Sequence, residues 1–145
     1  MSSVDFKTLL SKPASDIKKP VPLPAGTYRG VVLNHSFEVS SKKQTPFVRF
    51  YLQPQSAEAD VDEEALVGVE ITKKKLKIDF YLTPDAEFRV IDLGKSLGYQ
   101  TEGRSLGEVI TEISTNSPVL MEVTQQNSLD GQEIYNNVNK MRGQE

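Results

Sequence analysis

The sequence predicts a mostly β domain that closes into a small barrel, and three observations carry this prediction. Short segments alternate apolar and polar side chains, as strands with one buried face do. Five segments that are expected to be strands follow one another along the chain, and a helical insert separates the third from the fourth. The chain has 145 residues, of which 37% are hydrophobic and 26% charged, values that suit one folded domain with a modest core.

The first two strands are expected on either side of a polar turn. Residues 26–37 are rich in β-branched and aromatic side chains, which favour a strand, and residues 40–46 are polar and end in proline. The second strand is expected over Phe47–Gln53, where the side chains alternate regularly. Its inward set is Val48, Phe50 and Leu52, and its outward set is Phe47, Arg49 and Tyr51.

A long acidic loop separates the second strand from the third. Residues 55–72 hold six acids and no basic residue, and a helical turn is expected within them at Asp62–Leu66. The third strand is expected over Lys73–Leu82 because the alternation resumes there. Its inward residues are Leu76, Ile78, Phe80 and Leu82, and its outward residues are Lys75, Lys77, Asp79 and Tyr81.

Two short helices and two more strands complete the domain. Thr83 followed by Pro84 resembles a helix start, and that helix is expected to end near Gly98. A second helix is expected to begin at Ser105 and to end before proline 118. Strands at 119–125 and 133–142 flank a loop that contains an Asp-Gly turn signal. Three strands, a helical insert and two strands form the chain order of the five-stranded Greek-key barrel called the OB-fold.

Residues 1–25 are expected to form an N-terminal arm, which leaves residues 26–145 as the barrel domain. Residues 4–11 have the spacing for one or two helical turns. The prolines at positions 13, 20, 22 and 24 then forbid a continuing helix and favour an extended path. An arm that lies along the barrel is favoured over a proline-rich ligand for a partner domain.

The composition argues against an enzyme, a metal site and a membrane protein. The chain has no cysteine and a single histidine, His35, which we expect to be a solvated residue near the end of a strand. It contains no glycine-rich phosphate loop, no nucleophile elbow, no calcium-loop spacing, no signal peptide and no apolar stretch long enough to span a bilayer. We therefore expect a soluble, intracellular, non-catalytic protein without a cofactor.

Charge and aromatic residues on the strands point to nucleic acid. The net charge is −3, but outside residues 55–72 the chain carries 14 acids against 17 basic residues. Flat rings beside cations on a strand face are typical of single-strand binding, because bases stack on the rings and cations neutralise phosphates. The alternatives are that these rings pack beneath the arm or form a dimer interface. The candidate binding residues are Arg29, Lys42, Lys43, Phe47, Arg49, Tyr51, Lys73, Lys75, Lys77, Tyr81, Tyr135, Lys140 and Arg142.

Four short motifs, at residues 23–30, 45–50, 79–83 and 135–138, make the chain similar to a family of small phage-encoded proteins. These are Leu-Pro-Ala-Gly-Thr-Tyr-Arg-Gly, Thr-Pro-Phe-Val-Arg-Phe, Asp-Phe-Tyr-Leu-Thr and Tyr-Asn-Asn-Val. The resemblance runs from Val4 to Gly143 and implies a single-stranded DNA-binding OB-fold encoded beside replication and recombination genes. Many such proteins end in an acidic tail that recruits partners, whereas this sequence ends Lys-Met-Arg-Gly-Gln-Glu.

The leading hypothesis is that the protein coats and protects single-stranded DNA, largely without sequence preference, during phage replication and recombination. Its expected partners are single-stranded DNA and phage replication or recombination proteins, in the cytoplasm of the infected bacterial cell. It would act as a monomer or a homodimer. The alternative is a phage protein-interaction or virion structural module that uses the arm and the aromatic face for assembly.

Overall fold

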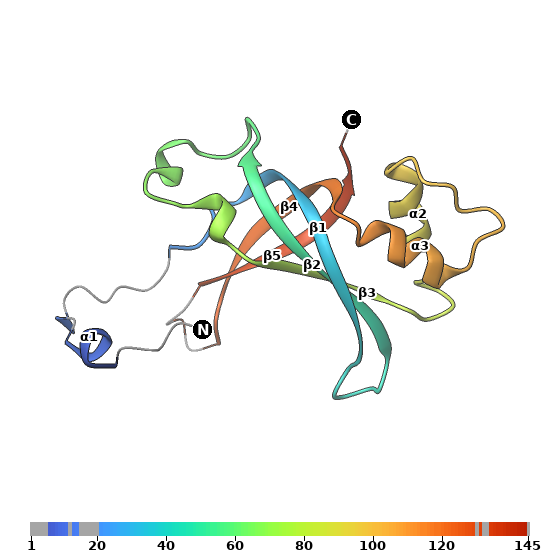
Figure 1. The fold of residues 1–145 in the computed structure, drawn as a ribbon, viewed down its shortest axis with the longest axis horizontal. Coiled ribbons are helices and arrows are strands. Elements are labelled where there is room, and N and C mark those ends of the chain that lie inside the picture. Colours follow the sequence, from blue (N-terminus) through green and yellow to red (C-terminus); the bar gives the residue numbers. More distant parts are fainter. Residues whose placement is uncertain (1–5, 12, 15–20, 130, 132–133, 145) are drawn as a thin grey trace.

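A computed structural model describes residues 6–11, 13–14, 21–129, 131 and 134–144 (Figure 1). Within them, five strands and a pair of adjacent helices form one barrel with a helical insert. The strands are β1 (Gly26–Val39), β2 (Pro46–Ala57), β3 (Leu76–Tyr81), β4 (Ser117–Asn127) and β5 (Ile134–Gly143). The helices are α1 (Phe6–Leu10), α2 (Phe88–Ser96) and α3 (Leu106–Ile113), with 3-10 turns at Glu64–Leu66 and Ile71–Lys73.

The strand order confirms the OB-type Greek-key barrel. All pairings are antiparallel and the order is β3-β2-β1-β4-β5, so β1 pairs with β2 on one side and with β4 on the other. The two outer strands, β3 and β5, lie beside each other and nearly close the barrel. The inward residues expected on the second and third strands are buried or partly buried in the core, which confirms the alternation. Among the described residues, no helix has the length and apolar character that crossing a bilayer requires.

Several strands and one helix begin or end at other residues than the sequence predicted. Strands β1, β2 and β4 are longer than expected, and β3 is shorter because a 3-10 turn occupies Ile71–Lys73. Helix α2 begins at Phe88 rather than just after Thr83. The carbonyl of Thr83 accepts bonds from the amides of Ala86 and Glu87, at 3.0 and 2.8 Å, and these bonds form a separate turn before the helix.

The bend of β1 depends on a glycine that has no room for a side chain. Gly30 sits where the β1–β2 register shifts, and a Cβ added there would lie 2.3 Å from the carbonyl oxygen of Gln53. The same atom would lie 2.6 Å from Cε of Met121. Irregularities of this kind bend a strand and increase its twist, which lets a sheet curl into a barrel.

The described end of the arm closes one end of the barrel. Leu23 is fully buried, and its backbone is held by amide side chains: its N–H donates to Oδ1 of Asn136 at 2.8 Å, and its carbonyl accepts from Asn136 and Gln125. Beside it, the buried hydroxyl of Tyr28 donates to the carbonyl of Pro24 at 2.7 Å. Burial, with a contribution from the charge of Asp60, raises the pKa of Tyr28 to about 12. Residues 23 and 24 therefore lie on the barrel, while 12 of the 25 residues of the arm are outside the described residues.

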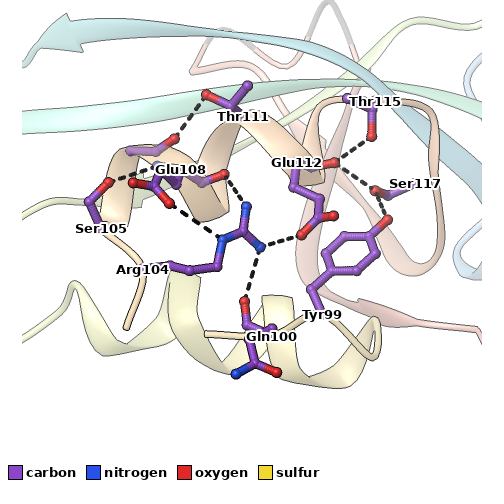
Figure 2. A network of polar contacts seen from close by, with 10 residues as sticks. Tyr99, Gln100, Arg104, Ser105, Glu108, Thr111, Glu112, Thr115 and Ser117 are labelled. Carbon is purple, nitrogen blue, oxygen red and sulfur yellow. Dashed lines mark hydrogen bonds and ion pairs between the residues drawn. The ribbon is translucent and has the colours of Figure 1, made fainter. Parts of the chain in front are cut away.

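A polar network connects the loop between the two insert helices to α3 (Figure 2). Arg104 donates to the carbonyl of Gln100 at 3.0 Å and to the carboxylate of Glu112 on α3. Ser105 caps α3 as expected, because its Oγ accepts from the amide of Glu108 at 3.2 Å. Figure 1 shows α2 and α3 side by side at one end of the barrel. This packing fixes the position of α2 relative to the strands.

We predict that Gly30→Ala lowers the free energy of unfolding by about 2 kcal/mol or more, because the new methyl group would overlap backbone atoms of β2. Gly107→Ala is the matched control, since no atom approaches closer than 4.0 Å to a Cβ at that helical position. The control should leave stability unchanged or raise it by up to about 1 kcal/mol. Urea unfolding of both variants measures the difference. Equal stability of the two variants would contradict the role given to Gly30.

Candidate nucleic-acid interface

The outward face of β2 and β3 brings together five of the sequence-predicted site residues. The register pairs Phe47 with Tyr81, Arg49 with Asp79, and Tyr51 with Lys77. Two tyrosines on this face are accessible, with 37% of Tyr51 and 48% of Tyr81 exposed. Lys77 is exposed beside Tyr51. The face therefore offers two rings and a lysine to a ligand, all held on rigid strands.

Phe47 does not offer a ring to solvent, so the expectation of an exposed aromatic at that position is wrong. Only 8% of the residue is exposed. Its ring packs edge-on against Tyr81, with 6.1 Å between ring centroids, and the guanidinium of Arg49 lies 5.3 Å from its centre. Neighbours on the same face cover it, and its function there is to support Tyr81 and Arg49.

Arg49 is held by two carboxylates rather than standing free. Its guanidinium makes two bonds to Asp79, at 2.8 and 3.1 Å, and lies 3.4 Å from Glu38 on β1. Only 22% of the side chain is exposed, and the hydrogen bond to Asp79 is the main reason why the pKa of Arg49 is raised above its usual value. A phosphate would have to displace Asp79 to reach this cation.

The lysines of the β1–β2 hairpin lie near Tyr81. A cleft of about 610 Å³ is lined by Lys42 and Lys43 of the hairpin, by Tyr81, and by residues that precede α2, including Thr83 and Asp85. Figure 1 shows this hairpin extending beyond the body of the barrel. The hairpin lysines and Tyr81 therefore line the same cleft.

Two cations of β5 line a second cleft that Tyr81 also lines. Lys140 and Arg142 line a second cleft, of about 700 Å³, together with Tyr81 and residues of α2. Tyr81 therefore lines both clefts, one with the hairpin lysines and the other with the basic residues of β5. Arg89 of α2 also lines the second cleft and was not among the sequence-predicted site residues.

The remaining candidates lie elsewhere. Arg29 is bonded to Glu58 and to Gln144, and Lys73 pairs with Glu70 at 3.0 Å. Lys75 precedes β3, and Tyr135, which is half exposed, pairs with Gln126 near the start of β5. Arg29 is near the start of β1, Lys73 and Lys75 precede β3, and Tyr135 is near the start of β5, all of which are remote from the hairpin. Three residues of the loop between β4 and β5, Asp130, Gln132 and Glu133, are outside the described residues.

His35 is not solvated as the sequence suggested. It is half-buried, its Nδ1 lies 2.7 Å from the hydroxyl of Ser114, and its ring packs against Phe37 and Phe50. These contacts give it a structural role between β1 and α3. In the part of the chain that the structure describes, no group of three or more histidine and acidic side chains is placed to hold a metal ion.

No protein-family model matches the chain, and neither does any curated protein sequence. The geometry of the outward face of β2 and β3, and of the two clefts beside it, is therefore the basis for a function.

The ion pair between Arg49 and Asp79 leads to a testable prediction. Asp79→Asn should strengthen binding of labelled oligo-dT by about two- to fivefold, the range of an exposed ion pair, because phosphate no longer competes with a carboxylate. Fluorescence polarisation measures the affinity. Glu102→Gln, in the loop between α2 and α3, is the control for the change in net charge. Unchanged or weaker binding by the Asp79 variant would remove Arg49 from the site.

Proposed function

We propose that this protein binds single-stranded DNA, with little dependence on sequence, across the outward face of β2 and β3. The observation that carries the proposal is the position of Tyr81. Its ring is half exposed at the end of β3, and it lines one cleft with the hairpin lysines and another with basic residues of β5. A ring that borders two clefts with cations suits a base whose adjoining phosphates extend in two directions.

Stacking of bases on the tyrosine rings explains why the bound DNA must be single-stranded. Bases are open to a flat side chain only when they are unpaired, and every base has a face that can stack, so sequence matters little. Tyr51 offers a second ring on β2, and its hydroxyl lies 3.1 Å from that of Ser36. That contact helps to fix the orientation of the ring before a ligand arrives.

The charge distribution supports the proposal despite the net charge of −3. Asp60, in the acidic loop, accepts bonds from the amide and hydroxyl of Thr27 at the start of β1, and these bonds lower the pKa of its carboxyl. Thr27 is far along β1 from the hairpin that carries Lys42 and Lys43. Because charges in physiological salt are screened over about 8 Å, the hairpin lysines act on phosphates largely independently of this loop.

The resemblance to small phage-encoded single-stranded DNA-binding proteins adds a biological setting to the proposal. In that setting the protein coats and protects single strands during phage replication and recombination inside an infected bacterial cell.

The tyrosines provide the test. Tyr51→Ala and Tyr81→Ala should each weaken binding of labelled oligo-dT by about 1–3 kcal/mol, the contribution of one stacked base. Tyr81→Phe is the matched control, because it keeps the ring and should keep the affinity. Fluorescence polarisation, sedimentation velocity and thermal melting are measured on the same samples.

Each competing explanation gives a different result in this experiment. If the face is an assembly surface, the alanine variants change the sedimentation coefficient and leave oligonucleotide binding unchanged. If the rings serve only packing, the variants melt at lower temperature with no specific loss of affinity. Either result would overturn the proposed function.

A further inference from the structure

A second feature, the cleft between β3 and β5, has the properties of a binding pocket. These strands are the two ends of the sheet order, and no backbone ladder joins them among the described residues. The cleft lies along Ile78–Tyr81 of β3 and Val138–Arg142 of β5, and has a volume of about 700 Å³. That volume is in the range of pockets for small organic ligands.

One face of α2 is directed into this cleft. Arg89, Asp92, Leu93 and Ser96 all line it. Their spacing of three, four and seven residues places them on a single side of a helix. The helix therefore presents a cation, a carboxylate, an apolar side chain and a hydroxyl to the same space.

The lining combines an apolar floor with a charged rim. Ile78, Leu93 and Val138 are largely buried and contribute apolar surface from three different elements. Tyr81, at the end of β3, provides a half-exposed ring. A flat heteroaromatic ring would be in contact with apolar side chains below and with an aromatic side chain at the edge.

The rim carries charges of both signs. Its cations are Arg89, Lys140 and Arg142, and none of them forms an ion pair with a described carboxylate. Asp79 also lines the cleft but is bonded to Arg49, which leaves Asp92 and Glu122 as the other carboxylates. A ligand that suits this rim has an anionic group and hydrogen-bond donors as well as an apolar ring.

We propose that the cleft binds one nucleotide of the strand, with its phosphate on the cations and an amino-bearing base over the apolar floor. Asp92 and Glu122 accept hydrogen bonds from the exocyclic amino group of cytosine, adenine or guanine, as carboxylates do in base recognition. Thymine has no such group. This inference rests on the proposed function, since it takes the ligand to be part of the bound single strand, and it adds a preference at one position to otherwise sequence-tolerant binding.

Methyl NMR of the full chain tests the proposal directly. Titration with the mononucleotide dCMP should shift the methyl signals of Ile78, Leu93 and Val138 and leave those of Val61, at the acidic loop, unchanged. Titration with dTMP, a pyrimidine of similar size without the amino group, should produce shifts only at concentrations about tenfold higher, the loss expected for one hydrogen bond to a charged group. Equal titration by the two nucleotides would overturn the role of the carboxylates. If dCMP leaves the cleft signals unchanged, the nucleotide pocket is overturned, and the unpaired edges of β3 and β5 become candidates for a peptide strand.

Two variants of α2 and one further titration distinguish nucleotide binding in the cleft from DNA binding on the outward face of β2 and β3. Arg89→Gln should weaken dCMP binding about tenfold, whereas Lys95→Gln, on the same helix but outside the cleft, should have no effect. Oligo-dT is then added to the unmodified protein. If oligo-dT binds while dCMP does not, the nucleotide pocket fails and the proposed function stands. If neither binds, both fail.

Discussion

The barrel depends on a close backbone approach at Gly30. At this point β1 pairs with β2 and β4, and a side chain would collide with Gln53 of β2 and with Met121 of β4. The bend brings the far edges of the sheet, β3 and β5, beside each other. Because the two edges meet without a ladder, a cleft remains between them, and α2 packs over it. A constraint in the central strand thus contributes to the position of the cleft between the two outermost strands.

Charged residues that form ion pairs determine the properties of the candidate interface as much as those that form none. The carboxylates of Asp79 and Glu38 occupy Arg49, while Lys77, Lys140 and Arg142 form no ion pair with any carboxylate in the described part of the chain. The buried Phe47 lies beneath this arrangement and supports Tyr81 by ring contact. As a result, Arg49 is held in position, while Lys77, Lys140 and Arg142 have no carboxylate partner in the described part of the chain, as the proposed contacts to phosphates require.

The sequence predicted the architecture well because alternation over short segments follows directly from which face of a strand is buried. It assigned the inward and outward sets of β2 and β3 correctly, and with them the outward direction of Tyr51 and Tyr81. It did not predict the burial of Phe47 or the ion pairs of Arg49, because both depend on which residues face each other across strands. The register became known only with the structure. The contribution of Arg89 was missed for a related reason: an exposed arginine on a short helix carries no signal until the helix is placed over the cleft.

The central claim, that the strand face binds unpaired bases, is tested most directly by comparing two ligands of equal length in a salt series. Labelled oligo-dT and a duplex of the same length are titrated with the protein, and fluorescence polarisation reports each affinity. The account predicts that the single strand binds about tenfold or more tightly than the duplex, because only its bases can stack on Tyr51 and Tyr81. It also predicts that log affinity falls with log salt by about 0.7 for each phosphate neutralised. Equal affinity for the two ligands, or an affinity that salt does not change, would contradict it.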